Sequence, residues 1–312
     1  MKKIPVWIDC DTGVDDSMAL MIALRLEELE VVGISAVAGN VGLEHTFKNT
    51  RDVVTLAGSD VKVYPGAAKP WIKPYVDASF FHGSDGLGGV ILEESKAAVE
   101  TEHAWDALYK AAKEYNGELR VVAVGPLTNI ATAVAKYPDL PQYVKEICIM
   151  GGAVIGGNTT PWSEFNIECD PHAAQAVFKS GIHVVMFGLD VTMKAYLTGE
   201  EVEELASYDN PAVRLIEKAN QIGLAFNESI GRGRLVHMHD SCPVLYLAHP
   251  ELFKGQDANV HVETRGFSSN GKTVTDLYSL FDSKKTEKNS TVMLEIDREK
   301  TIAIIKEIFK KY

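Results

Sequence analysis

The sequence predicts a single α/β domain over residues 1–312, with a doubly wound, mostly parallel sheet, flanking helices and a small late antiparallel strand group. Short β-branched segments alternate with amphipathic segments through the first two-thirds of the chain, which is the pattern of βαβ units. Several strand-like segments are apolar at every position, as in residues 121–124, which suits strands buried on both faces. No linker rich in Pro, Gly or Ser divides the chain, so we expect one domain.

The expected elements follow one another in a regular order. Strands are predicted over residues 4–9, 31–38, 119–124, 146–150 and 183–187. Helices are predicted between them, because apolar residues recur at i, i+3 and i+4, over residues 14–27, 43–57, 104–115, 127–136 and 171–180. The last third is expected to hold helices 200–207 and 211–230, antiparallel strands 259–265, 275–280 and 291–296, and a helix over 298–311.

Composition excludes several classes of function. The chain has 31 Lys and Arg against 43 Asp and Glu, a net charge of −12, which argues against a nucleic-acid or anionic membrane partner. No apolar run reaches the roughly 18 residues of a membrane span, and Asp9 comes too early for a secretory signal. The four cysteines show no paired spacing, so we expect reduced thiols in a cytoplasmic protein.

Four carboxylates follow the first predicted strand within eight residues: Asp9, Asp11, Asp15 and Asp16. Ligands of open parallel sheets bind outside the carboxyl ends of the strands, so these side chains are candidates for a site. A capping box from Thr12 to Asp15 would account for two of the four. Crowded carboxylates raise each other's pKa values or bind a cation, and a cluster of oxygen ligands alone indicates Ca²⁺ or Mg²⁺. The segment predicts a metal or polyol site.

Two other interpretations stay open at this point. A strand that ends in Asp-x-Asp-Thr also begins haloacid-dehalogenase-like phosphatases, in which Asp9 would be the nucleophile and Asp11 the acid/base, with Mg²⁺. Such an enzyme needs a second acidic pair after a late strand, and no convincing pair follows residues 183–187. The other alternative is a nucleoside- or ribose-binding protein without catalysis.

The remaining strand ends carry neutral polar groups. Asn40 follows the second strand, and the turn after residue 124 leaves the Val124 carbonyl at the same edge. We expect Glu164 and Asn166 to share one side of an extended segment, as a grip for sugar hydroxyls, with Phe165 on the other side. Asp170 before Pro171 is expected to cap a helix.

Two histidines are candidate proton donors. His239 lies beside Asp240, and His82 lies in a long loop over residues 66–92 that is rich in glycine. Histidine is the side chain whose ordinary pKa lies nearest to neutrality. We expect the other histidines in helix or strand contexts to be structural.

Taken together, these segments resemble the nucleoside hydrolases, the inosine–uridine-preferring N-ribohydrolases. The similarity covers residues from about 5 to 250, in the order 9–16 (Asp-Cys-Asp-Thr-Gly-Val-Asp-Asp), 125–129 (Gly-Pro-Leu-Thr-Asn), 150–152 (Met-Gly-Gly), 164–167 (Glu-Phe-Asn-Ile) and 239–240 (His-Asp). Thr12 stands where the family often has proline, and Pro126 where it has glycine; both lie in turns.

The resemblance implies a role for each candidate residue. It implies one Ca²⁺ held by Asp11, Asp16, Asp240 and the Val124 carbonyl, with Asp11 also the general base. The ribose 2′- and 3′-hydroxyls would meet Asp15, Asn40 and Asn166. The remaining sugar contacts would come from Met150, Asn158, Glu164 and Phe165, and His239 or His82 would protonate the leaving base.

The implied reaction is hydrolysis of a ribonucleoside to base and ribose, as in nucleoside salvage. The substrate is a small molecule, and the family suggests a homodimer or homotetramer. The preference for purine or pyrimidine bases is not readable from the sequence. We expect the wall over residues 221–234 to decide it.

Overall fold

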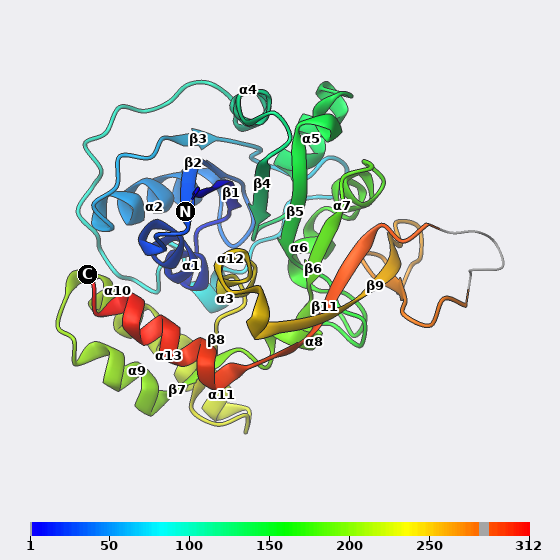
Figure 1. Cartoon of the computed structure of the whole chain (residues 1–312). Helices are drawn as coiled ribbons and strands as arrows, with labels where there is room; N and C mark the ends of the chain where they lie inside the picture. Colours follow the sequence, from blue (N-terminus) through cyan, green and yellow to red (C-terminus); the bar gives the residue numbers. More distant parts are fainter. Residues whose placement is uncertain (1, 281–286) are drawn as a thin grey trace.

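The computed structural model describes residues 2–280 and 287–312, and it contains the predicted doubly wound sheet (Figure 1). Within these residues a nine-stranded sheet has the order β10-β9-β11-β6-β5-β4-β1-β2-β3. The six strands from β3 to β6 are parallel to their neighbours. The strand order therefore changes direction at β1, which has β2 on one side and β4 on the other.

Most predicted elements are present within a few residues of their expected ends. The strands are β1 (Ile4–Cys10), β2 (Leu29–Ala36), β3 (Val63–Pro65), β4 (Leu119–Ala123), β5 (Val144–Met150), β6 (Val184–Phe187), β7 (Tyr196–Thr198), β8 (Leu235–His237), β9 (Phe253–Val262), β10 (Thr273–Asp276) and β11 (Ser290–Ile296). The helices are α1 (Val14–Arg25), α2 (Leu43–Leu56), α3 (Ser79–His82), α4 (Ala104–Tyr115), α5 (Thr128–Lys136), α6 (Phe165–Cys169), α7 (Pro171–Phe178), α8 (Leu189–Thr192), α9 (Gly199–Ala206), α10 (Pro211–Ala219), α11 (Gln221–Ser229), α12 (Ser241–Ala248) and α13 (Arg298–Phe309). Two short 3₁₀ turns are η1 (Leu140–Gln142) and η2 (Pro250–Leu252).

Helices cover both faces of the parallel strands, as Figure 1 shows. Along β4, Val122 belongs to the core beneath α1, α10, α12 and α13, whereas Val121 and Ala123 belong to the core beneath α4, α5 and α7. Both sets of side chains are buried. This is why the central strands are apolar at every position instead of alternating with polar residues.

The late antiparallel strands extend the main sheet. β11 pairs in parallel with β6 and antiparallel with β9, and β10 pairs antiparallel with β9 at the sheet edge. β9 begins six residues before the predicted start. The strands β3, β7 and β8 were not predicted. Each is only three residues long, which is too short to show a hydrophobic period.

The single helix predicted over residues 211–230 is wrong. The segment forms two helices, α10 and α11, which meet at Asn220. The Asn220 side chain donates from Nδ2 to the Ile216 carbonyl at 2.8 Å. An asparagine amide that binds the preceding turn in this way competes with continuous helix. The break lets α11 pack along β8.

The cysteines and the apolar helices are two further features of the described chain. All four cysteines, Cys10, Cys148, Cys169 and Cys242, are buried and free. No helix in the described part of the chain is long and apolar enough to cross a bilayer.

The contact between β1 and β2 gives a stability prediction. A Cβ atom on Gly33 would lie 2.4 Å from the Trp7 ring, which is buried and donates to Ser35 Oγ at 2.8 Å. We expect Gly33→Ala to lower the free energy of unfolding by about 2 kcal/mol, within the usual range for overpacking. Urea denaturation measures this. Gly42→Ala is the control, because nothing lies within 4 Å of its Cβ position; equal losses in both variants would contradict the packing argument.

Candidate active site

A cavity of about 540 Å³ opens beyond the carboxyl ends of the central strands, next to the point between β1 and β4 where the strand order reverses. Ligands of doubly wound sheets bind at this position. Twelve of the thirteen residues predicted for the site line it, and the thirteenth, Asp16, lies beside them. The twelve are Asp11, Asp15, Asn40, His82, Val124, Met150, Asn158, Glu164, Phe165, Asn166, His239 and Asp240.

Carboxylates gather on the floor of this cavity. Oxygen atoms of Asp15, Asp16 and Asp240 all lie within 4.8 Å of one another. Asp240 comes from the segment after β8, more than 220 residues from Asp16, so the fold brings this carboxylate to the others. The predicted metal set named the side chains of Asp11, Asp16 and Asp240, whereas the trio within this distance has Asp15 in place of Asp11.

Asp11 touches this trio through Asp16. Its Oδ2 accepts from the Asn40 backbone N–H at 2.7 Å, and its Oδ1 is buried without a hydrogen-bond donor among the described residues. Two glycines press against the same carboxylate: a Cβ atom would lie 2.1 Å from Oδ2 at Gly39 and 2.7 Å from Oδ1 at Gly125. The position of Asp11 is therefore tightly fixed.

The predicted capping box from Thr12 to Asp15 is wrong. The N-cap of α1 is Gly13, which has no side chain, and the Asp16 carboxylate accepts from the Gly13 N–H at 2.9 Å. The Thr12 hydroxyl instead bonds to that of Thr50 at 2.7 Å, because β1 runs on to Cys10 and turns Thr12 toward α2. Asp15 is thereby left to face the cavity.

The electrostatics of the cluster indicate that a cation belongs there. Burial, followed by the nearby carboxylates, raises the pKa of Asp11 and of Asp240 well above the ordinary range. Burial raises the pKa of Asp15 and Asp16 as well. Buried carboxylates in mutual contact are costly unless they are protonated or bind a cation. An all-oxygen donor set with the unpartnered Oδ1 of Asp11 fits a hard divalent ion.

The expected extended segment around Asn166 is helical. Glu164 caps the short helix α6, and Asn166 lies in its first turn. The Asn166 Nδ2 group donates to the Val124 carbonyl at 2.8 Å and to the Met150 carbonyl at 3.1 Å. It thereby bridges the ends of β4 and β5. Its Oδ1 atom remains to accept from a ligand.

Glu164 is buried and is held by backbone donors. Its Oε1 accepts from the Asn166 N–H at 2.8 Å, and Oε2 accepts from Gly152 at 2.9 Å and Ile167 at 3.2 Å. Burial nevertheless raises the pKa of Glu164 to about 7. The carboxylate therefore links the two ends of the loop over residues 151–164 while it faces the cavity.

The His239 ring is partly buried, beside Thr192 and His237. Its Nδ1 lies 2.8 Å from the Thr192 hydroxyl, and its ring stacks on His237 with centroids 5.2 Å apart. Burial lowers the pKa of His239 to about 3, which differs from the expectation of a group that titrates near neutrality. A Thr192 hydroxyl that donates to Nδ1 leaves Nε2 as the N–H donor.

His82 stands across the mouth, at the end of α3. Its Nδ1 accepts from the Val14 N–H at 3.3 Å, and burial lowers its pKa. Aromatic neighbours complete this wall: Phe81 meets Phe226 of α11 edge to face, with centroids 5.8 Å apart. These two phenylalanines were not predicted as site residues. Aromatic residues in a glycine-rich loop and on a helix near the expected base wall could have indicated them.

Asp9, the nucleophile of the phosphatase interpretation, does not line the cavity. It is completely buried below Asp11, and its Oδ1 accepts from the Asn129 amide at 2.7 Å and from the Ser35 hydroxyl. Burial raises its pKa to about 7. A carboxylate enclosed in this way cannot reach a phosphate ester, so the structure argues against that interpretation.

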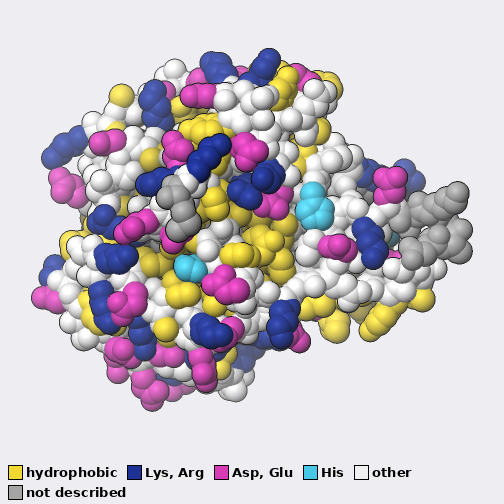
Figure 2. All heavy atoms as spheres, in the orientation of Figure 1, with side chains coloured by type: hydrophobic (Ala, Val, Ile, Leu, Met, Phe, Trp, Pro, Cys, Tyr) yellow, Lys and Arg dark blue, Asp and Glu magenta, His cyan; other side chains and the backbone are white. Residues whose placement is uncertain are grey.

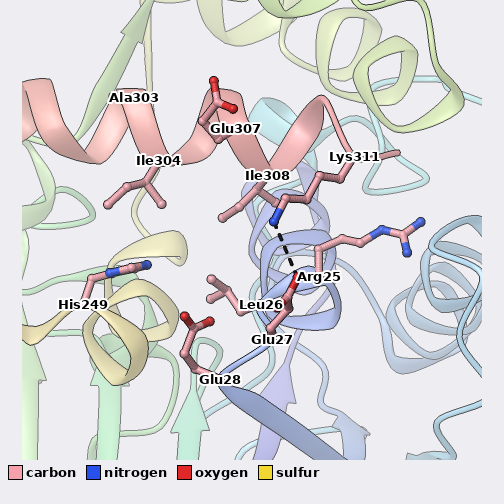
Figure 3. Close-up of a pocket in the computed structure, with 10 residues that line it drawn as sticks. All are labelled: Arg25, Leu26, Glu27, Glu28, His249, Ala303, Ile304, Glu307, Ile308 and Lys311. Atoms are coloured by element: carbon pink, nitrogen blue, oxygen red, sulfur yellow. Dashed lines mark ion pairs between the residues drawn. The ribbon is translucent and has the colours of Figure 1, made fainter. Parts of the chain in front are cut away.

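A second pocket of about 390 Å³ lies at the end of α1, against α13 and near the start of β2 (Figure 3). Figure 3 shows Lys311 reaching toward Glu27, with 3.8 Å between Nζ and Oε1. None of the predicted site residues lines it. Figure 2 shows acidic and basic side chains interspersed over the face in view, rather than a broad basic surface.

Comparisons with known proteins agree with this geometry. The sequence profile of the inosine-uridine preferring nucleoside hydrolases matches residues 6–303. The pyrimidine-specific ribonucleoside hydrolase RihA of Citrobacter koseri is 39% identical over 306 residues, which is 97% of each chain. Among solved structures, a plant nucleoside hydrolase has a TM-score of 0.93 with 29% identity over the full length of both chains. A purine-preferring ribonucleoside hydrolase from Gardnerella vaginalis has a TM-score of 0.91 with 31% identity, covering 99% and 100% of the two chains.

A sheet of this order, with a cavity and carboxylates at its switch point, defines an α/β protein with a site for a small polar ligand. The chain belongs to the inosine-uridine preferring nucleoside hydrolase family. It is a nucleoside N-ribohydrolase that acts on ribonucleosides.

The packing around Asp11 gives a prediction for activity. We expect Gly39→Ala to reduce ribonucleoside hydrolysis about 100-fold or more, because the new Cβ would displace Asp11 and an error of about 1 Å can cost that much. Steady-state kinetics measures the loss, and circular dichroism checks the fold. Gly42→Ala, three residues away in open space, should keep activity near the wild-type level. Full activity in Gly39→Ala would contradict a fixed Asp11.

Proposed function

We propose that the chain hydrolyses the N-glycosidic bond of ribonucleosides with Ca²⁺ as its cofactor, releasing base and ribose for nucleoside salvage. The observation that carries this proposal is the trio of Asp15, Asp16 and Asp240 carboxylates, within 4.8 Å of one another and beside Asp11. No other cluster of metal-ligating side chains of that kind is present in residues 2–280 and 287–312.

The proposed ion is held by Asp11, Asp16, Asp240 and the Val124 carbonyl, with Asp15 close enough to contribute. Carboxylate and carbonyl oxygens suit Ca²⁺, which accepts irregular sites of about 6–8 oxygens, better than they suit zinc or copper. When bound, the ion would lower the pKa of a coordinated water and orient the ribose diol. It would also relieve the repulsion among the carboxylates.

The proposed sugar site uses the neutral and acidic groups around this floor. In the proposed complex, Asp15, Asn40 and Asn166 hold the 2′- and 3′-hydroxyls, and Asn158 with Glu164 holds the 5′-hydroxyl. Met150 and Phe165 line the same cavity and would flank the ribose ring. The oxygen atoms of these side chains stabilise the positive charge that develops on the ribose as the C–N bond breaks.

In the proposed reaction Asp11 acts as general base. It takes a proton from water as the water oxygen bonds to C1′, and the electron pair of the C1′–N bond leaves with the base. Direct attack of this kind inverts the configuration at C1′, as in inverting glycosidases. The orphaned Oδ1 atom of Asp11 supplies an acceptor on the cavity floor.

The leaving base needs a hydrogen bond or a proton at its nitrogen. His239 is our first candidate donor and His82 the second, because both rings line the cavity away from the carboxylate floor. The neutral state favoured by burial makes His239 an N–H donor that becomes most useful as negative charge develops on the base.

We further propose a preference for pyrimidine ribonucleosides. The pyrimidine-specific RihA proteins of Citrobacter koseri and of Escherichia coli are 39% and 37% identical across nearly the whole chain. The purine-preferring structural relative from Gardnerella vaginalis is less similar, at 31%. The base would face the wall formed by Phe81, Phe226, Asn227, Ile230, Arg232 and His237.

The proposed setting is the cytoplasm, with the protein as a homodimer or homotetramer. Four buried free thiols are compatible with a reducing compartment. The oligomeric state follows from the family resemblance and can be measured by size-exclusion chromatography with light scattering.

Metal removal and a substrate panel test the proposal together. We expect the purified protein to release ribose from uridine and cytidine faster than from inosine and adenosine. Chelation with EGTA followed by desalting should reduce all rates at least 100-fold, because the carboxylates then repel one another and the diol is not oriented. Ca²⁺ should restore activity fully and Mg²⁺ only partly. Activity unchanged by exhaustive chelation would contradict the metal, and an inverted ranking only the base preference.

The roles of Asp11 and His239 can be separated with an activated substrate. We expect Asp11→Asn to abolish hydrolysis of both uridine and a nitrophenyl riboside, because both need the attacking water deprotonated. His239→Ala should slow uridine by about 10²–10⁴-fold, the usual contribution of acid–base assistance, while it spares the nitrophenyl riboside, whose leaving group needs no proton. His82→Ala is the matched comparison. Equal losses on both substrates in His239→Ala would remove that histidine from the leaving-group role.

A further inference from the structure

The segment directly after β5 is held by side chains from distant parts of the chain rather than by regular secondary structure. The Gly152 N–H donates to Glu164 Oε2 at 2.9 Å, and the Ala153 N–H donates to Thr273 Oγ1 at 2.9 Å. The next two N–H groups, of residues 154 and 155, both donate to the Asp190 carboxylate, at 2.6 Å to Oδ2 and 3.1 Å to Oδ1.

The carbonyl groups of the same segment are held in a similar way. Lys272 Nζ donates to the carbonyls of Ala153 and Val154, each at 2.8 Å, and the Thr273 hydroxyl also donates to Ala153 at 2.8 Å. The Gly152 carbonyl accepts from the Leu189 N–H at 2.9 Å. Asp190 from α8 and Lys272 from the edge of β10 therefore grip opposite sides of one stretch of backbone.

Packing leaves this segment little freedom close to the sheet. Gly152 has a φ of +79°, and a Cβ atom there would lie 2.7 Å from Thr273 Cγ2. Farther along, the side chains of the loop supply little burial, since Ile155 is 82% exposed. The path of the loop beyond residue 153 depends on its polar contacts more than on apolar packing.

This path matters because the next residues face the substrate cavity. Gly156, Gly157, Asn158 and Thr159 all line it, as does Asp190 itself. Asn158 Oδ1 accepts from the Phe165 N–H at 3.0 Å, so its Nδ2 amide remains to donate to a ligand. Any shift of residues 154–155 would move that amide relative to Asp11.

We propose that Asp190 is a positioning residue: with Lys272 and Thr273, it fixes the backbone after β5 so that Asn158 and Glu164 meet the 5′-hydroxyl of the ribose. This inference rests on the proposed function, because it takes the 5′ end of a ribonucleoside to lie at Asn158. It assigns to α8 and β10, which carry none of the predicted site residues, a role in substrate placement.

The test compares each enzyme variant with a substrate that lacks the 5′-hydroxyl. Steady-state kinetics are measured for wild type and Asp190→Asn on uridine and 5′-deoxyuridine, with Ca²⁺ present. Asparagine keeps the shape but presents an NH₂ group to a backbone N–H. We expect kcat/KM for uridine to fall about 10- to 100-fold, mainly through KM, as for a misplaced binding group. For 5′-deoxyuridine kcat/KM should fall less than about threefold, because this substrate has no 5′-hydroxyl for the misplaced Asn158 amide to bind.

Lys272→Met repeats the test from the other side of the loop and keeps the aliphatic part of the side chain. If Asp190→Asn fails to fold, the kinetics of Lys272→Met test the positioning role instead. Asp297→Asn is the matched control, since Asp297 also accepts a backbone N–H, from Lys300 at 3.2 Å, and does not line the cavity. Equal losses on both substrates, or no loss on uridine, would overturn the positioning role. A wild-type protein that hydrolyses no ribonucleoside would overturn the proposed function instead.

Discussion

Mutual repulsion among four crowded aspartates, three of them buried, is the constraint around which the rest of this site is arranged. Asp11, Asp15, Asp16 and Asp240 are crowded at the end of β1, and burial raises the pKa of each. The surrounding structure holds them there: the α1 N-terminus and Asn40 donate hydrogen bonds, and Gly39 and Gly125 leave space for Asp11 alone. Such an arrangement is costly without a cation and stable with one. The crowded carboxylates therefore favour binding of a divalent ion, and the ribose diol can coordinate the same ion.

Much of the fold and of this floor was predictable because the relevant signals are local. A run of β-branched residues followed by a polar residue predicts a buried strand. It also predicts that the polar side chain lies at the carboxyl edge of the sheet. Asp11 and Val124 follow adjacent strands, and Asn40 the next one, so they had to meet once the strands were known to be parallel. The same rule did not place Asp240, which follows the short strand β8; only its resemblance to a family motif did so.

The residues that were missed act through contacts remote in sequence. Thr192 lies 47 positions from His239, and Asp190 lies 35 and 36 positions from the backbone groups it binds. Lys272 is 119 positions from Ala153. Each belongs to an ordinary helix or strand edge, where nothing in the local pattern separates a structural side chain from one that orients a site. Likewise, α6 is only five residues long and begins at a side-chain cap, so an alternating pattern was a reasonable but wrong expectation.

One ion in the carboxylate cluster is essential to the proposed activity, and locating that ion is the most direct test. Crystals of the wild-type protein grown with millimolar calcium should show one anomalous peak coordinated by Asp11, Asp16, Asp240 and the Val124 carbonyl, with Asp15 beside it. Asp240→Asn crystals grown in the same way should show that peak weakened or lost. Wild-type density with the four carboxylates in contact and no ion among them would contradict the account.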